Sequence, residues 1–347
     1  NVTTTRGRAD SSTAFVATYG TGTKTFTISP NISGITVNSS TGVVSVAATT
    51  AAGTYIETVT ATDSVTATGK IALTIVVNPE IQIAGGATLY TTVTIPRSSV
   101  PFTQVAGTGT GSKYFSLTPT ISGITIDSVT GVVTADGTIA AGTYYESVTS
   151  TDSLGVKGYK ALTVQINSAI VLTNGSAVTT TKGVARSSTA FSTTGGTVTG
   201  ASGGSRAMIF SIAPSVSGIS INNATGVITV DSSTADGTYI ETVTATDSVT
   251  AFGETTTTIV VNKYIVISGG SNITTTYGLA RNSDTFTTTE GTGTKTFSIL
   301  PGTSGISIGS TTGVVTVSAT TSAGTYKETI TVTDSRSEEH TSELQSH

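Results

Sequence analysis

The sequence predicts an all-β fold: four tandem antiparallel β-sandwiches of about 90 residues each, with no substantial helix. Three observations lead to this prediction. Thr makes up 79 of the 347 residues and Gly 39, a composition that suits exposed strand faces and tight turns. The phrase Gly-Thr-Tyr recurs at intervals of 89, 95 and 87 residues. Within each interval, apolar and polar residues alternate with the period of two that β-strands have.

The repeats are marked by four phrases that recur in one order: Ser-Gly-Ile, Thr-Gly-Val, Gly-Thr-Tyr and Thr-Asp-Ser. A period near 90 residues exceeds that of a solenoid turn and matches an autonomous β-sandwich. We therefore expect repeats at 1–78, 79–167, 168–262 and 263–335. The first repeat is expected to lack its first strand, and the fourth its last. Neighbouring repeats follow each other without a long Gly/Ser linker, so no free hinge is expected between them.

The alternation assigns faces to individual strands. In residues 54–63, Tyr55, Glu57 and Val59 share the face that is expected to point inward, whereas Ile56 lies on the outward face. A Tyr that follows Gly-Thr at the start of this strand predicts a tyrosine corner, with the ring in the core and the hydroxyl on nearby backbone. The four tyrosines in this position are Tyr55, Tyr144, Tyr239 and Tyr326.

Residues 336–347 break the pattern of the repeats. They match the translation of a common sequencing-library adapter, so we interpret them as a non-native tail. This tail holds both His residues, and the whole chain has no Cys. The repeats themselves therefore contain no His or Cys, which excludes Ser–His and Cys–His nucleophiles, disulfides, and metal sites built on imidazole or thiolate.

Charge is low throughout the chain. Charged residues make up 10%, and the formal net charge is -4. A protein that binds nucleic acid would need clustered basic residues, so we expect no nucleic-acid partner. No stretch approaches the ~18 apolar residues of a membrane span, so no span is expected in this fragment.

A carboxylate is expected inside each repeat. Glu57 lies on the inward face, and Lys24 shares the inward face of its own strand with Phe26 and Ile28. A buried carboxylate is costly unless it is paired, so we expect a buried or half-buried ion pair in each repeat. The expected pairs are Lys24 with Glu57, Lys113 with Glu146, Arg206 with Glu241, and Lys295 with Glu328.

An alternative for the same residues is covalent. The Glu would then promote an intramolecular Lys–Asn isopeptide bond, as in some bacterial surface adhesins. The candidate acceptors are Asn78, Asn167 and Asn262. Arg206 cannot form this bond, and Asn78 lies off the inward face, so the ion pair is the favoured interpretation.

The run from Phe115 onward reads Phe-Ser-Leu-Thr-Pro, then Ser-Gly-Ile-Thr-Ile-Asp, Thr-Gly-Val-Val and Gly-Thr-Tyr-Tyr-Glu. It resembles the Ig-like and dystroglycan-type cadherin-like repeats that occur in tandem in secreted and surface proteins, many of them bacterial. The resemblance covers all four repeats. It implies a β-sandwich fold and a location outside the cell or on its surface.

The resemblance also raises calcium as a cofactor. Asp63, Asp152, Asp247 and Asp334 match the position of the family's Ala-x-Asp carboxylate. The family's other acidic motifs are replaced by neutral residues, and calcium needs six to eight oxygens with several carboxylates. One Asp per junction is too few, so we expect no cofactor and interpret each Asp as the cap of a turn together with the following Ser. These four remain weak calcium candidates.

These features predict a non-enzymatic structural or adhesive repeat region of a large secreted or cell-surface protein, such as an adhesin stalk, a surface-layer subunit or a filament subunit. The expected partners are other copies of the chain or other surface proteins. The alternative is an accessory glycan-binding or spacer module of a secreted polysaccharide-degrading enzyme. Sugar-binding sites stack rings on exposed aromatics, and this chain has no Trp and only 6% aromatic residues.

Overall fold

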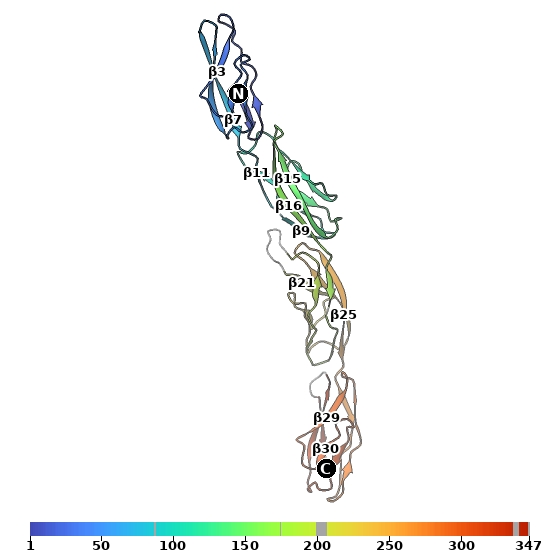
Figure 1. The fold of residues 1–347 in the computed structure, drawn as a ribbon. Coiled ribbons are helices and arrows are strands. Elements are labelled where there is room, and N and C mark those ends of the chain that lie inside the picture. The colour runs from blue at the N-terminus through green and yellow to red at the C-terminus, as the bar shows by residue number, and fades with distance from the viewer. Residues whose placement is uncertain (87, 174, 199–206, 336–339, 346–347) are drawn as a thin grey trace. The chain divides into compact units, whose positions relative to one another are not determined.

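The structure, a computed structural model, describes residues 1–86, 88–173, 175–198, 207–335 and 340–345 (Figure 1). Every regular element in these ranges is a β-strand. Within them, no helix is long and apolar enough to cross a membrane. Asn1–Ser168 make one compact unit, and the described residues from Ala169 onward make a second. Each unit contains the same sheet pattern twice.

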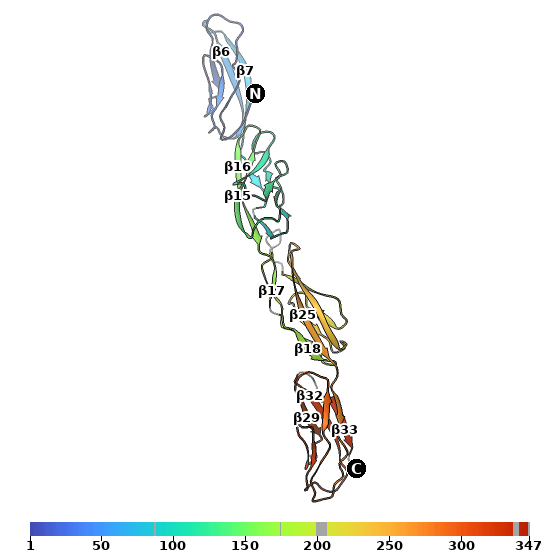
Figure 2. The same cartoon turned by 90° about the vertical axis from the view of Figure 1, so that its right-hand side faces the viewer.

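The first copy of this pattern consists of two facing sheets. The larger sheet orders β1 (Val2–Thr5), β7 (Thr68–Asn78), β6 (Gly53–Thr62) and β3 (Thr25–Ser29). The smaller sheet orders β2 (Asp10–Ser11), β5 (Val44–Val46) and β4 (Ile35–Val37). Apolar side chains from both sheets form one core, which includes Val44 of the smaller sheet and Ile75 of the larger. β6 and β7, which are labelled in Figure 2, form a long antiparallel hairpin at the centre of the larger sheet.

The second copy adds a two-stranded ribbon to this pattern. Its larger sheet orders β9 (Thr88–Thr92), β16 (Lys157–Asn167), β15 (Gly142–Thr151) and β12 (Tyr114–Thr118). Its smaller sheet orders β10 (Arg97–Ser98), β14 (Val133–Ala135) and β13 (Ile124–Ile126). The ribbon pairs β8 (Ile83–Ala84) with β11 (Thr103–Gln104).

The second unit repeats both sheets and the ribbon. In its first copy, the larger sheet orders β18 (Val178–Thr181), β25 (Phe252–Asn262), β24 (Gly237–Thr246) and β21 (Ile209–Ala213). The smaller sheet orders β19 (Arg186–Ser187), β23 (Ile228–Val230) and β22 (Ile219–Ile221). The ribbon pairs β17 (Val171–Thr173) with β20 (Ser192–Thr194). In its second copy, the larger sheet orders β29 (Lys295–Leu300), β32 (Lys327–Asp334) and β33 (His340–Gln345). The smaller sheet orders β27 (Arg281–Asn282), β31 (Val315–Val317) and β30 (Ile306–Ile308). The ribbon pairs β26 (Val266–Gly269) with β28 (Phe286–Thr289). The chain is thus an all-β protein of tandem β-sandwiches.

Pairing is mostly, but not wholly, antiparallel. β1 pairs with β7 in parallel, and β9 with β16 and β18 with β25 do the same. The prediction of antiparallel β-sandwiches is confirmed for the fold class, and these three pairs are its parallel exceptions. The two strands of each pair are not joined by a hairpin, which would force them to run in opposite directions. Both instead run toward the same end of their sandwich.

The assignment of strand faces is confirmed. On β6, Glu57 is fully buried and Val59 nearly so, whereas 69% of Ile56 is exposed. The period of two therefore gives the correct orientation even for a carboxylate. The reason is that adjacent Cβ atoms leave a strand on opposite sides.

The segment interpreted as a non-native tail takes part in a sheet. β33 pairs antiparallel with β32, in the place that β7, β16 and β25 hold beside the equivalent strands of the other copies. The edge of β32 in the fourth copy is therefore covered by a strand from this segment. Ladder hydrogen bonds come from the backbone, so an open edge pairs with extended chain of almost any sequence.

Candidate functional site

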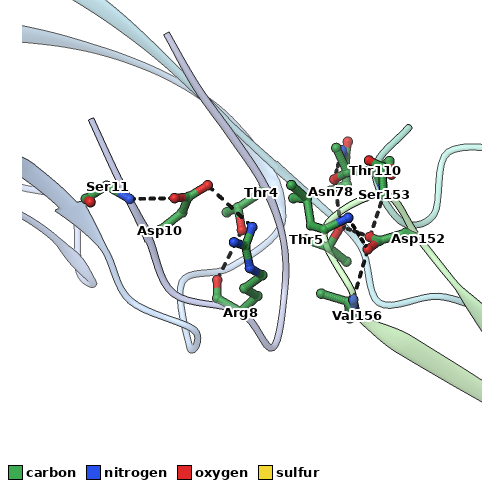
Figure 3. A network of polar contacts seen from close by, with 11 residues as sticks. Thr4, Thr5, Arg8, Asp10, Ser11, Asn78, Thr110, Asp152, Ser153 and Val156 are labelled. Carbon is green, nitrogen blue, oxygen red and sulfur yellow. Dashed lines mark hydrogen bonds and ion pairs between the residues drawn. The ribbon is translucent and has the colours of Figure 1, made fainter. Parts of the chain in front are cut away.

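Four polar side chains meet where the first copy joins the second. The Thr5 hydroxyl donates to Asp152 Oδ2 at 2.7 Å. The hydroxyl oxygens of Thr5 and Thr110 lie 2.6 Å apart, and Asn78 Nδ2 donates to Thr110 Oγ1 at 2.9 Å. Because the Thr5 proton is committed to the carboxylate, the Thr110 hydroxyl must be the donor to Thr5. The result is a one-way chain of donors from Asn78 through Thr110 and Thr5 to Asp152 (Figure 3).

The second unit contains the same arrangement. The hydroxyls of Thr181 and Thr292 lie 2.7 Å apart, and Thr181 donates to Asp334 Oδ2 at 3.1 Å. Asn262 Nδ2 donates to Thr292 Oγ1 at 2.6 Å. Two junctions, more than a hundred residues apart in the sequence, are therefore built from the same four residue types in the same order. We call each set of four a junction network.

The strand register places these side chains together. In the parallel pair of β1 and β7, Thr5 lies opposite Asn78, so both side chains leave the same end of the first copy. Thr110 is supplied by a loop of the second copy, between Gly109 and Gly111, which have φ of 68° and 67°. Glycine adopts this left-handed conformation without strain. The loop therefore turns tightly enough to present Thr110 to both neighbours.

Asp152 also closes the hairpin turn that follows β15. Its second carboxylate oxygen accepts the amides of Leu154 and Val156, each at 2.9 Å, and Oδ2 accepts the amide of Thr110 at 2.9 Å. Burial raises the pKa of this carboxyl, but hydrogen bonds from Thr5, Thr110 and the turn amides outweigh it and hold the pKa below its ordinary value. Asp152 is therefore a fully bonded anion at neutral pH, and the donors that satisfy it belong to the protein.

The other Asp residues considered for calcium are held by amides as well. Asp63 accepts the amides of Thr21, Val65 and Ala67. The amide of Thr21 is the main cause of its lowered pKa, and the turn amides add to it. Asp247 accepts the amides of Thr197, Val249 and Ala251. Among the described residues, no three acidic or His side chains gather as metal ligands do.

Among the described residues, the expected ion pairs of Lys24 with Glu57, Lys113 with Glu146, and Lys295 with Glu328 are not formed. Glu57, Glu146 and Glu241 are buried as expected, but neither carboxylate oxygen of any of them has a hydrogen-bond partner. Lys24 Nζ instead donates to the Gly20 carbonyl, Lys295 Nζ donates to the Gly293 carbonyl, and Lys113 is exposed. Arg206 lies outside the described residues. The long Lys side chain starts from the inward face, but its charge stays hydrated by leaving at the end of the strand.

Burial without a partner shifts the titration of these carboxyls. It raises the pKa of Glu57 and of Glu241. It raises the pKa of Glu146 to about 7, although the nearby amide of Ile121 offsets part of the rise without reaching hydrogen-bond geometry. Each group is therefore more readily protonated in the folded chain than in the unfolded chain.

Glu328, the equivalent Glu of the fourth copy, is hydrogen-bonded, unlike the other three. Its two carboxylate oxygens accept the amides of Gly302 and Thr303 at 2.9 and 3.0 Å. Burial raises its pKa, but hydrogen bonds from Thr303 and Gly302 outweigh burial, and the net pKa is lowered. Gly302 has a φ of 68°, a conformation that residues with a Cβ rarely adopt. This conformation lets two successive amides face one carboxylate.

The isopeptide alternative has no support in the geometry. Asn78 Nδ2 is bound to Thr110 Oγ1, and Lys24 Nζ is bound to the Gly20 carbonyl. Asn262 Nδ2 is bound to Thr292 Oγ1. The asparagines proposed as acceptors belong to the ends of the sandwiches, whereas the buried Glu residues lie in their interiors. An isopeptide bond forms only where the Lys amine contacts the Asn carboxamide and the Glu carboxyl lies beside both. Neither Asn78 nor Asn262 is placed in this way.

Each Tyr assigned to a corner donates from its hydroxyl to the backbone carbonyl four residues upstream. The distances are 2.8 Å for Tyr55, 2.9 Å for Tyr144, 2.8 Å for Tyr239 and 2.9 Å for Tyr326. The ring of Tyr55 packs on the core of its copy. This is the bond that the sequence analysis assigned to these residues.

Sequence reasoning missed the Thr members of the junction networks and considered the Asn members only as isopeptide acceptors. A signal was present, because Thr5, Thr92, Thr181 and Thr276 occupy equivalent positions, and an Asn recurs at Asn78, Asn167 and Asn262. In a chain with 79 Thr residues this recurrence is not distinctive. Only the placement of one sandwich against the next brings Thr5 within reach of Asp152, 147 residues away.

Comparison with known proteins identifies no family for the chain. No protein-family model and no curated protein matches the chain. Solved structures with similar folds include the protocadherin gamma B2 extracellular cadherin domains 3–6 (14% identity, 100% of this chain and 96% of that chain, TM-score 0.29) and Drosophila N-cadherin EC1–4 (14%, 100% and 98%, 0.29). Another is the three-Ig structure of titin domains I67–I69 (10%, 76% and 96%, 0.35). Similarity this low carries no argument about function.

Proposed function

We propose that this chain is a non-enzymatic repeat region of a secreted or cell-surface protein, with a structural or adhesive role in which the junction networks couple successive sandwiches. The observation that carries the proposal is the junction network itself, found in both units with the same residue types. A connection that served only as a linker would not need a buried, fully bonded Asp at its centre.

The chemistry of the network suits a permanent connection. One carboxylate receives the Thr5 hydroxyl and three amides, and the Thr110 hydroxyl donates to Thr5 and accepts from Asn78. Charge-assisted hydrogen bonds of this kind are stronger than neutral ones. Removing one partner from such a buried set costs about 1–3 kcal/mol. A bending motion that separated the copies would break the set, so the network favours one joint geometry over others.

The hydrogen-bond donors of the junction network also determine how the charge of its Asp is balanced. Where calcium would balance several carboxylates, here a single negative charge is balanced by protein N–H and O–H groups. The proposed joint is therefore independent of calcium, and without Cys it is independent of redox state. Both properties suit a region that spaces or connects other parts of a surface protein.

Single-molecule force spectroscopy on the full chain tests the proposal. A region that carries load should unfold in separate events, each releasing roughly 30 nm of chain if a repeat of about 90 residues unfolds as one unit. The pattern should be the same in calcium and in EGTA. Smooth extension at low force without separate events would contradict a load-bearing role.

The alternative, a glycan-binding or spacer module of a polysaccharide-degrading enzyme, stays a prediction from the sequence. Exposed aromatic rings are the feature that it requires, and Tyr145 and Tyr159 are 71% and 66% exposed. A glycan pulldown with the wild-type chain and with a Tyr145→Ala, Tyr159→Ala variant separates the two proposals, because a chain that only spaces domains has no binding to lose.

A further inference from the structure

The outward faces of the larger sheets carry large apolar side chains in two of the copies. In the second copy, the exposed side chains of this kind are Tyr114, Tyr145 and Tyr159, which are 52%, 71% and 66% exposed. In the third copy, they are Ile209, Ile240 and Phe252, which are 60%, 68% and 64% exposed. They lie on strand positions that point away from the core. Clusters of exposed apolar groups mark surfaces where another molecule binds.

The first copy has smaller or charged residues at most of the matching positions. Thr25 lies opposite the last residue of β6, as Tyr114 lies opposite the last residue of β15. Lys70 takes the register position of Tyr159. Ile56 is the exception, and it is 69% exposed. The apolar faces therefore distinguish two copies and are not a general feature of the fold.

These two faces also carry opposite charges. Among the described strand residues, the outward face of the second copy has one charged side chain, Lys157, two residues before Tyr159 on β16. The outward face of the third copy has one as well, Glu254, two residues after Phe252 on β25. Both charged residues are exposed, and the Thr244 hydroxyl donates to Glu254 Oε1 at 3.1 Å.

The charged residue and the aromatic ring come in reverse order on the two strands. β16 presents the cation first and then the ring, whereas β25 presents the ring first and then the anion. Stacking the two faces with these strands antiparallel places Lys157 against Glu254. The same stacking places Tyr159 against Phe252. One register therefore satisfies both the charges and the rings.

The faces are large enough for a weak interface. Each sheet has two strands of ten or eleven residues and two shorter ones. At about 4.8 Å between strands, such a face measures roughly 500 Å². Stacking two of them buries about 1,000 Å² in total, which is the lower bound for a specific protein–protein contact. A contact of this size predicts transient association.

We propose that the larger-sheet face of the second copy binds the larger-sheet face of the third copy on another molecule of this chain. In this contact β16 of one chain runs antiparallel to β25 of the other, and the pair of Lys157 with Glu254 sets the register. The partner is a second chain because the two faces match each other in charge and in ring position, and both belong to this sequence. The inference rests on the adhesive role proposed above and gives that role a surface and a partner.

Sedimentation velocity of the full chain between about 1 and 500 µM tests the proposal. The wild-type chain should associate reversibly as its concentration rises. Lys157→Glu and Glu254→Lys should each weaken association by at least about tenfold, because each places like charges against each other. The double variant restores opposite charges, so its affinity should return to within about threefold of the wild type.

Lys70→Glu is the matched control. Lys70 is exposed and holds the register position of Tyr159 in the first copy, and its reversal changes the net charge by the same amount as Lys157→Glu. This variant should associate like the wild type. Since all three replaced side chains are exposed, the thermal unfolding of each variant should match that of the wild type.

Three results would overturn the proposal. The first is a wild-type chain that stays monomeric over the whole range, which would favour a partner of another kind, such as the glycan considered above. The second is weakening by both single reversals without recovery in the double variant, because Lys157 and Glu254 would then not contact each other. The third is equal weakening by Lys70→Glu, which would show a response to net charge alone. The proposed joints would stand in each case, since force spectroscopy measures single chains.

Discussion

The buried Glu residues provide a test in which two equivalent positions should respond to pH in opposite ways. Burial raises the pKa of Glu146 from 4.5 to about 7. At roughly 1.4 kcal/mol for each pKa unit, this shift corresponds to about 3 kcal/mol. Because the folded pKa is raised, the folded chain binds more protons than the unfolded chain between pH 4.5 and about 7. The contribution of Glu146 to the stability of the second copy is therefore fully present below pH 4.5, and up to that amount is lost as the pH rises through 7.

Glu146→Gln removes the charge and keeps the shape. It should raise the free energy of unfolding of the second copy at pH 8 by up to about 3 kcal/mol and change little at pH 4.5. Glu328→Gln is the matched control, because the folded pKa of Glu328 is lowered by its hydrogen bonds. Its contribution is present above the unfolded pKa and lost as the pH falls through the folded pKa. At pH 8, Glu328→Gln should therefore destabilise the fourth copy.

Hydrogen exchange followed by mass spectrometry resolves the two copies within the full chain, since it reports local unfolding free energies segment by segment. Carbon-13 NMR of the Glu carboxyls measures both pKa values directly. The reasoning fails if Glu146 titrates near 4.5, or if Glu146→Gln and Glu328→Gln shift stability at pH 8 in the same direction.

Four further predictions concern the joints and the corners. Thr5→Val should lower the unfolding free energy by about 1–3 kcal/mol in chemical denaturation, because it takes a donor from Asp152, whereas Thr3→Val on the exposed face of the same strand should have no measurable effect. Calcium and EGTA should leave the calorimetric midpoint unchanged; a rise of several degrees with calcium would show a site that the protein donors do not complete. The intact mass should equal that calculated from the sequence, and the loss of one ammonia would restore the isopeptide interpretation. Tyr144→Phe should cost about 1 kcal/mol by removing the bond to the Ala140 carbonyl, and an unchanged denaturation midpoint would show that this bond contributes nothing.

Sequence reasoning reached the fold because strand periodicity is a local property. The period of two placed Glu57 and Val59 inward and Ile56 outward without knowledge of any partner strand. The same reasoning failed for the partner of Glu57. A face assignment locates the Cβ atom, but the Lys24 ammonium lies several bonds beyond Cβ and donates a hydrogen bond to the Gly20 carbonyl.

The partners of Glu328 show why such contacts have no sequence signal. Its donors are the main-chain amides of Gly302 and Thr303, and every residue except Pro carries that donor. What decides the contact is the conformation of the loop. The other copies carry the Glu at the same position, but their loops leave it without a partner.

The sequence by itself determined the all-β class, the repeating unit and the direction in which each side chain leaves its strand, because these depend on short-range spacing along the chain. Tertiary structure decided which distant groups meet. Asp152 could be recognised as a turn cap from the residues beside it, but its bond to Thr5 depends on how one sandwich is placed on the next. Hydrogen bonds and packing act over a few ångströms of space, and only the folded chain defines which residues lie within that range.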